Sequence, residues 1–235
     1  GTLDGALITH PPFRCPHNTS SYVSVIGGGT FPKPGEVTLA HKGVLFLDEF
    51  PEFDRRVIES LRQPLEDRVV HISRSKGTAV FPTNFILIAA MNPPPDNATA
   101  SEIVRYKKKI SGPIIDRIDM WVDVPKIDYE LLGTKEKSGE TSEEIIKRVI
   151  KARHRQAKRL TGSKAKTNSE MSVRDLDEVV FLKDDIKNIL NTSAEKLGLS
   201  ARAYHRIIKL ARTIADLDDK EDIEIKHILE ALAYR

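Results

Sequence analysis

Two short apolar runs, each ending in polar side chains, constrain the fold of this chain more than any other feature. The first is VLFL (44–47), which is followed by Asp48 and Glu49, and the second is FILIAAM (85–91), which is followed by Asn92. Continuous apolar runs of this length are typical of strands that are buried on both faces of a parallel sheet. The sequence therefore predicts two parallel strands whose carboxyl ends carry a pair of carboxylates and an amide.

The segment between these runs predicts how the two strands are connected. Phe53, Val57, Ile58 and Leu61 recur at helical spacing within residues 52–67, which indicates an amphipathic helix. A strand, a helix and a second strand make a crossover connection, so the fold class is α/β. A third strand is predicted at DMWVDVP (119–125), where apolar and polar residues alternate and the run stops at a proline.

Two segments interrupt this alternation of strands and helices. Residues 69–81 predict a hairpin whose turn is RSKG (74–77), because β-forming residues flank a short polar stretch with a glycine. Residues 19–37 are rich in glycine and proline, and we expect no regular element within them.

The character of the chain changes after Tyr129. A polar linker covers residues 133–144, and four helices are predicted near residues 142–160, 183–197, 200–216 and 224–234. The first of these is rich in lysine and arginine, and two interpretations compete for it. We favour a solvated helix with four apolar residues packed inward, namely Ile145, Ile146, Val149 and Ile150, over a DNA-binding helix.

Composition excludes several classes of protein. A net charge of +3 permits a nucleic-acid partner without requiring one. The single cysteine excludes an intrachain disulfide and a cysteine-rich zinc site, and it favours a reducing, cytoplasmic setting. The chain contains no apolar run of the roughly 18–20 residues that a transmembrane helix needs, so we expect no membrane span.

The residues at the predicted strand ends carry the chemistry. An aspartate such as Asp48 holds Mg²⁺ through water, and the adjacent Glu49 is suited to orienting and polarising an attacking water molecule. Asn92 is suited to holding the same water or a γ-phosphate oxygen. The alternatives are a strand that ends in a solvated acidic turn and an asparagine that begins a turn before three prolines.

Two arginines extend this candidate site. Arg117 precedes the predicted third strand and suits an arginine finger for the nucleotide of a neighbouring subunit. The alternative is a local ion pair with Asp116 or Asp119. Arg202 lies in the first turn after Ser200, from where it can reach a γ-phosphate, and the alternative is a solvated basic face.

Four segments together resemble the magnesium-chelatase-like AAA+ ATPases, and the nearest subgroup is the ComM/YifB-like proteins. They are PGEVTLAHKGVLFLDEFPEFDRRVIESLRQPLE, ILIAAMNP, SGPIIDRID and LSARAYHRIIKLARTIAD. The resemblance covers nearly the whole chain. It implies an AAA+ P-loop NTPase-type parallel sheet, incomplete because the phosphate-loop strand is missing, followed by an α-helical lid domain. The implied domains are an α/β core over residues 1–130, a linker over 131–144 and a lid over 145–235.

The resemblance also assigns roles to the candidate residues. It implies that VLFLDEF (44–50) is the Walker B segment, with Asp48 on the magnesium side and Glu49 as the catalytic carboxylate. Asn92 matches sensor 1, Arg117 the trans-acting arginine finger and Arg202 the sensor 2 arginine. The implied cofactors are ATP and Mg²⁺, and the implied assembly is a hexameric ring with ATP between subunits.

The substrate implied by the resemblance is DNA, with two alternatives. The ComM-like group is similar to ring helicases that drive branch migration in natural transformation and recombination. Related rings direct the segments at 19–37 and 69–81 into the central pore, where Lys33, Arg74 and Lys76 would meet DNA phosphates. For Arg74 and Lys76 the alternative is a solvated turn. The alternative functions are a chelatase-type ATPase subunit that acts on a protein or metal-insertion complex, and a nucleotide-independent binding module.

One departure from the family pattern limits what the chain does by itself. No G-x-x-x-x-G-K-[ST] motif occurs in the sequence, and the resemblance places this phosphate loop upstream of Gly1. Because the chain begins with glycine, we expect it to be a piece of a longer protein. We expect the piece to bind nucleotide weakly and to hydrolyse it negligibly, and the complete protein to be an ATPase.

Overall fold

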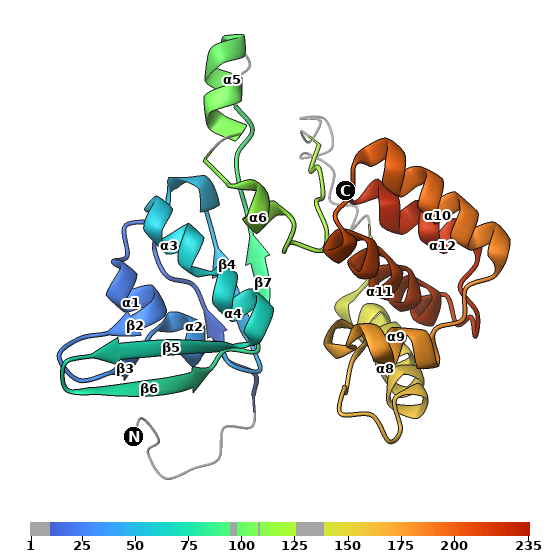
Figure 1. The fold of residues 1–235 in the computed structure, drawn as a ribbon, viewed down its shortest axis with the longest axis horizontal. Coiled ribbons are helices and arrows are strands. Elements are labelled where there is room, and N and C mark those ends of the chain that lie inside the picture. The colour runs from blue at the N-terminus through green and yellow to red at the C-terminus, as the bar shows by residue number, and fades with distance from the viewer. Residues whose placement is uncertain (1–9, 95–97, 108, 126–138) are drawn as a thin grey trace. The chain divides into compact units, whose positions relative to one another are not determined.

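The computed structural model describes residues 10–94, 98–107, 109–125 and 139–235. The chain divides into two compact units, Gly1–Arg117 and Ile118–Arg235 (Figure 1). Residues 118–125 therefore group with the helical unit, whereas the sequence placed them in the α/β core. Residues 126–138, which include most of the predicted linker, lie outside the described residues. In the described part of the chain, no helix is long and apolar enough to cross a membrane.

The first unit contains a parallel three-stranded sheet with the order β1-β4-β7. Its strands are β1 (Phe13–Arg14), β4 (Val44–Leu47) and β7 (Ile86–Ala89). Leu45 and Leu47 of the central strand β4 are fully buried. The parallel α/β fold class is confirmed, and the two strands predicted from apolar runs are neighbours, with Leu47 paired to Ala89.

The expectation that both strands are buried on both faces is wrong for β7. Ile86 and Ile88 are 64% and 47% exposed. Alternate side chains of a strand point to opposite faces, so these two residues mark one uncovered face. In the described part of the chain β7 pairs only with β4, which places it at the edge of the sheet.

The predicted helix at residues 52–67 is present but broken. After the 3₁₀ turn Phe50–Glu52, it forms α3 (Arg55–Ser60) and α4 (Arg62–Asp67). Pro64 explains the break, because proline has no N–H to donate to the carbonyl four residues earlier. The predicted apolar face is confirmed as buried, at Phe53, Val57, Ile58 and Leu61. Two further short helices follow β7, α5 (Ala100–Lys107) and α6 (Gly112–Ile115).

The two interrupting segments form small structures that lie side by side (Figure 1). Residues 69–82 form the predicted hairpin, with β5 (Val69–Arg74) and β6 (Gly77–Pro82). The glycine- and proline-rich segment does contain regular elements, contrary to expectation. They are α1 (Tyr22–Ile26), the ribbon strands β2 (Gly27–Gly28) and β3 (Lys33–Pro34), and α2 (Glu36–Leu39). Ser21 caps α1 by accepting a hydrogen bond from the backbone of Ser24.

The predicted third strand at residues 119–125 is absent. The segment has no regular structure, and its backbone bonds to the C-terminus of the helical unit, where the Trp121 N–H donates to the Tyr234 carbonyl at 2.9 Å. Asp119 is held by Arg206 of α11 at 2.5 Å. The alternation of apolar and polar residues in this segment therefore did not show whether a neighbouring strand is available to pair with it.

The second unit is helical, as predicted. Its elements are α8 (Ser142–Arg159), the 3₁₀ turn Asn168–Glu170, α9 (Val173–Val179), α10 (Asp184–Leu197), α11 (Ala201–Leu217) and α12 (Ile225–Ala233). The sequence missed α9. Helix α8 is capped by Thr141, in a reciprocal pair with Glu144. The core includes the fully buried Leu190, Ala211 and Ile228.

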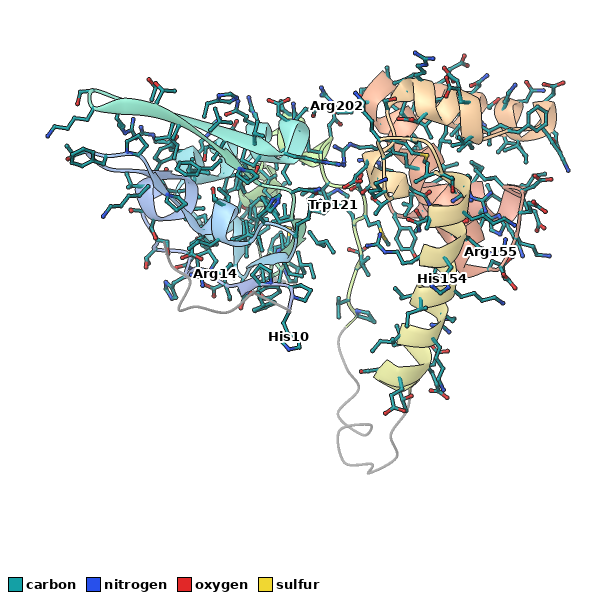
Figure 2. All side chains as sticks on the ribbon, turned by 90° about the horizontal axis from the view of Figure 1, so that it is seen from below. His10, Arg14, Trp121, His154, Arg155 and Arg202 are labelled. Atoms are coloured by element: carbon teal, nitrogen blue, oxygen red, sulfur yellow. The ribbon has the colours of Figure 1, made fainter. Side chains whose placement is uncertain are left out.

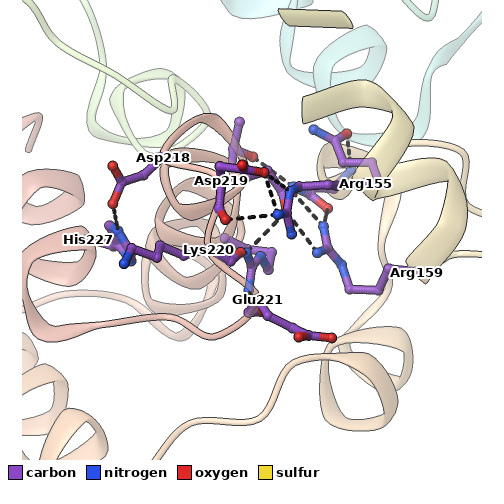
Figure 3. Close-up of polar contacts among 12 residues, drawn as sticks. Arg155, Arg159, Asp218, Asp219, Lys220, Glu221 and His227 are labelled. Carbon is purple, nitrogen blue, oxygen red and sulfur yellow. Dashed lines mark hydrogen bonds and ion pairs between the residues drawn. The ribbon is translucent and has the colours of Figure 1, made fainter. Parts of the chain in front are cut away.

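The packing predicted for α8 is wrong in its first half. Ile145, Ile146, Val149 and Ile150 are between 43% and 54% exposed. The buried positions of α8 come later, at Ala152 and Gln156. Its last turn is tied to α11 by Arg159, whose guanidinium donates to both oxygens of the buried Asp216 at 2.8 and 2.5 Å (Figure 3).

An ion cluster lies at the start of α12, around Asp218. The Asp218 carboxylate accepts hydrogen bonds from Lys226 and His227 (Figure 3). These bonds, that of Lys226 most, lower the pKa of Asp218 from 3.8 to about 2. The ring nitrogen Nδ1 of His227 accepts from the Glu224 N–H at 2.9 Å, so the neutral ring carries its proton on Nε2, which faces Asp218 at 3.1 Å. Neither nitrogen offers a lone pair to a metal, so the cluster is a helix cap.

The cluster predicts how stability depends on pH. A carboxyl whose pKa is lowered by folding stabilises the protein fully above its unfolded pKa, and this stabilisation is lost as pH falls through the folded pKa. For Asp218 the window lies between pH 3.8 and about 2. Asp218→Asn should therefore lower the urea midpoint at pH 6 and show a smaller further loss towards pH 2 than the wild type. An identical acid response in both proteins would contradict this role, and the exposed Asp177→Asn is the control.

Candidate catalytic sheet edge

The carboxyl ends of β4 and β7 bring the predicted carboxylates and amide to one edge of the sheet. The ladder continues beyond the strands, since the Ala90 N–H donates to the Leu47 carbonyl and the Phe50 N–H donates to the Ala90 carbonyl, both at 2.9 Å. Asp48 and Glu49 therefore lie opposite Ala90, between the two residues that bond to it. Asn92 lies two residues beyond Ala90 in the segment that follows β7. All three candidate residues are exposed. The parallel pairing of β4 with β7 thus brings Asp48, Glu49 and the segment of Asn92 to the same edge of the sheet.

Glu49 has an unusual backbone conformation. Its φ and ψ of 50° and 43° lie in the left-handed region, which costs a non-glycine residue about 1–3 kcal/mol. Burial of the next two residues offsets this cost, because Phe50 is only 1% exposed and Pro51 is also buried. Backbone strain of this kind collects at functional sites, and here it falls on the predicted catalytic carboxylate.

Asn18 is a site residue that the sequence reasoning missed. Its side-chain Nδ2–H donates to Glu49 Oε2 at 2.6 Å. Asn18 follows β1, which pairs with β4 on the side opposite to β7. Three parallel strands therefore each contribute a polar side chain to the same edge. The signal in the sequence was weak, because β1 has only two residues and the segment PHNTSS (16–21) resembles an ordinary turn.

Asp48 fits a magnesium ion by the chemistry of its donor set. Its Oδ1 accepts the Glu49 N–H at 2.9 Å, which fixes the carboxylate at the strand end. The group is exposed, and Mg²⁺ prefers oxygen ligands and keeps several of its own waters. Asp48 would hold the ion through water, where the ion would offset phosphate charge.

The segment that carries Asn92 is anchored from α5. The Tyr106 hydroxyl donates to the Asn92 carbonyl. Burial raises the pKa of Tyr106, and the nearby Lys109 lowers it in part. The phenol is therefore protonated at neutral pH and remains a donor. This bond holds the backbone at Asn92.

Arg117 is held by contacts within the first unit. Its side chain is 13% exposed and its Nε lies 3.1 Å from Glu66 of α4. Its Nη1–H donates to the Pro113 carbonyl at 2.7 Å. The predicted alternative, an ion pair with Asp116 or Asp119, is replaced by one with Glu66. A role as a trans-acting finger stays a prediction, and it requires Arg117 to leave these contacts.

Arg202 belongs to the helical unit. It lies in the first turn of α11, one residue after the helix begins, and it is exposed (Figure 2). Ser200 caps this helix, because its hydroxyl accepts the Ala203 N–H at 3.2 Å. The sensor 2 role of Arg202 stays a prediction.

The three cations predicted to contact DNA lie on the two neighbouring small structures. Lys33 is in β3, Arg74 ends β5, and Lys76 is in the two-residue turn between β5 and β6. All three are exposed. A rigid ion pair joins this region to the sheet, since Arg14 of β1 donates to both oxygens of Glu36 in α2 at 2.5 and 2.7 Å.

Comparisons with known proteins identify the family to which the sequence is similar. The family described as magnesium chelatase, subunit ChlI, matches residues 2–132, and its C-terminal family matches residues 139–235. Competence protein ComM of Haemophilus influenzae is 43% identical over 232 residues, and the uncharacterized protein YifB of Salmonella typhimurium is 40% identical. Each alignment covers 95% of this chain and 45% of the relative, so the chain spans about half the length of these relatives. The maternal DNA replication licensing factor mcm6 of Xenopus tropicalis is 20% identical over 84% of this chain and 25% of its own length.

Proposed function

This chain belongs to the magnesium chelatase ChlI family, and we propose that it forms the catalytic sheet edge and the lid of an AAA+ ATPase that remodels or translocates DNA. The observation that carries the proposal is the register of β4 and β7, which aligns Asp48 and Glu49 with the segment leading to Asn92. In open α/β sheets, ligands bind at the carboxyl ends of the strands. Carboxylates and an amide at that edge suit a nucleotide with its magnesium ion.

Each residue at the edge has a distinct task in this proposal. Asp48 holds the magnesium ion through water. Glu49 orients and polarises the attacking water, and because Asn18 engages its Oε2, the other oxygen, Oε1, takes the proton. Asn92 orients the same water or a γ-phosphate oxygen. Asn18 is a positioning residue, because it acts only through Glu49.

The two arginines complete the site in an assembly. We place Arg117 against the nucleotide of a neighbouring subunit and Arg202 against the γ-phosphate from the lid. If another copy supplies the arginine, each active site lies at the boundary between two subunits. A head-to-tail ring, here a hexamer, provides one such boundary for each subunit. Support for this part comes from the family and from the motif order.

DNA is the substrate that the surface charge supports best. Three exposed cations extend from neighbouring turns, and no acidic residue occurs in residues 20–35 or 68–82. The similarity to mcm6, which is named a DNA replication licensing factor, points in the same direction. The second candidate is a chelatase-type ATPase that acts on a protein or metal-insertion complex, and the family's name favours it.

The test is the ATPase rate of the full-length protein with and without branched DNA. We expect DNA to raise the rate, and Lys76→Ala to reduce this stimulation while leaving the rate without DNA unchanged. Lys187→Ala, on the helical unit, is the matched control. A rate that is indifferent to DNA would favour the chelatase-type function, and a full-length protein without ATPase activity would favour a binding module.

A further inference from the structure

An exposed aromatic side chain lies where the two small structures meet. Phe31, in the turn between β2 and β3, is 61% exposed. The Lys76 amine, in the turn of the β5–β6 hairpin, lies 4.9 Å from the centre of its ring. We call Phe31, Lys33, Arg74 and Lys76 the aromatic tip. Its residues come from separate turns of the chain, so the tip exists only because the two structures pack together.

Glycine at the base of the tip allows this packing. A Cβ on Gly28 would come within 2.9 Å of the Arg74 guanidinium. A Cβ on Gly27, whose φ is +111°, would lie 2.5 Å from Ile72 Cδ1 and 2.6 Å from the Lys33 carbonyl oxygen. The positive φ and the close approach both require glycine. The tip is therefore a built arrangement in which the backbone of β2 accommodates β5.

The ring of Phe31 is exposed beside cations that come from a separate hairpin. Exposing apolar surface costs about 25 cal/mol per Å², and a phenyl ring gains from burial. The cation above the ring adds an attraction but leaves most of the ring accessible. A ring that is open to solvent among cations, in segments without acidic residues, suits a ligand that has both flat apolar faces and negative charge.

We infer that the aromatic tip binds single-stranded nucleic acid, with one base stacked on Phe31 and adjacent phosphates on Lys33, Arg74 and Lys76. Aromatic side chains beside cations bind single strands in this way with little sequence preference. The bases of a duplex are already stacked on one another, so a duplex offers Phe31 no free face. This inference rests on the proposed DNA substrate and adds the strand state and the residue that contacts the base.

A matched pair elsewhere in the chain provides the control. Phe181 is 74% exposed, and the Lys187 amine lies 6.0 Å from its ring centre. This pair differs from the tip in its charged surroundings, because four acidic residues, Asp177, Glu178, Asp184 and Asp185, surround it in sequence and offset the nearby Lys183. It has the same aromatic ring and the same kind of cation but not the charge that would attract phosphates.

The experiment measures binding of fluorescent thymine oligonucleotides to the 235-residue chain, without nucleotide. Phe31→Ala and Phe31→Leu should each weaken binding about tenfold or more, Phe31→Tyr should retain it, and Phe181→Ala should leave it unchanged. Lys76→Ala should reduce the salt slope by about 0.7, the value for one phosphate contact on a single strand. Wild-type affinity in Phe31→Leu, or equal losses for duplex and single strand, would overturn the inference.

A spectroscopic readout reports stacking directly. In a Trp121→Phe background, Phe31→Trp introduces the single tryptophan at the tip, and Phe181→Trp introduces it at the control position. Thymine oligonucleotides should quench the first and not the second, and unchanged fluorescence at position 31 on binding would overturn the inference. The assay needs no ATP hydrolysis. Strand binding without DNA-stimulated ATPase would contradict the proposed motor alone, and stimulation without quenching would contradict the stacking alone.

Discussion

Glu49→Gln is expected to lower the ATP hydrolysis rate of the full-length protein by about 10²–10⁴-fold, the usual contribution of a general base. Glutamine has the same shape, and its carbonyl oxygen still accepts the hydrogen bond that Asn18 now gives to Glu49 at 2.6 Å. It does not take a proton from water. Nucleotide affinity should therefore be retained, and the loss should appear in kcat.

Two further variants test whether the loss belongs to this carboxylate. Glu52→Gln removes an exposed acid three residues away, which pairs with Lys109 at 2.7 Å, and it should leave the rate unchanged. Asn18→Ala keeps Glu49 but removes its donor, so we expect an intermediate loss in kcat of about tenfold with KM unchanged. Hydrolysis at the wild-type rate in Glu49→Gln would refute the proposed role of the edge.

The link from Asn18 to Glu49 also connects the sheet edge with the aromatic tip. Asn18 lies between β1 and α1, and α1 leads directly into the ribbon that carries Phe31 and Lys33. Arg14 and Glu36 fasten the far end of the same segment to β1. In the proposed motor, a ligand that moved the ribbon would displace the segment whose Asn18 side chain bonds to Glu49. The segment would thereby offer a short physical path from a DNA contact to the proposed catalytic carboxylate.

The sheet edge could be predicted from sequence because its determinants are local. An apolar run long enough for a strand, followed at once by polar residues, specifies both the strand and what its end carries, as at Leu47–Asp48 and at Asn92. Parallel pairing then brings the ends together without further information. Asn18 follows a strand of two residues, which no apolar pattern reveals, so the third contribution to the edge was visible only in the structure.

The errors share a physical origin, because apolar patterns report which residues prefer burial and not what covers them. Ile86 and Ile88 follow the strand pattern, yet one face of β7 is uncovered in the described residues. Val122 and Val124 alternate correctly, yet their segment bonds to the C-terminal helical residues and not to a strand. The first half of α8 has an apolar stripe that the described core does not reach. Each case needed knowledge of a tertiary partner.

Arg117→Ala is expected to lower ATP hydrolysis in the full-length protein by about 10³-fold or more, the effect of losing an arginine finger. The ion pair with Glu66 makes a structural role the competing explanation, since its Nε lies 3.1 Å from that carboxylate. Glu66→Gln separates the two, because it breaks the same pair but keeps the guanidinium. We expect Glu66→Gln to retain the rate and to lower stability, because the mostly buried Arg117 loses its charged partner. Equal losses of rate in both variants would show that Arg117 acts only by holding α4.

Mixing the two inactive variants tests whether Arg117 acts across a subunit boundary. An Arg117→Ala subunit keeps Glu49, and a Glu49→Gln subunit keeps Arg117, so a site built from both has each group intact. Random mixing in equal amounts should restore about a quarter of the wild-type rate, because about one boundary in four combines the two intact surfaces in the correct order. If Arg117 served its own subunit, every site in the mixture would lack one group. If the mixtures are as inactive as the separate variants, Arg117 and Glu49 of one subunit serve the same active site. That result would contradict an active site shared between two subunits.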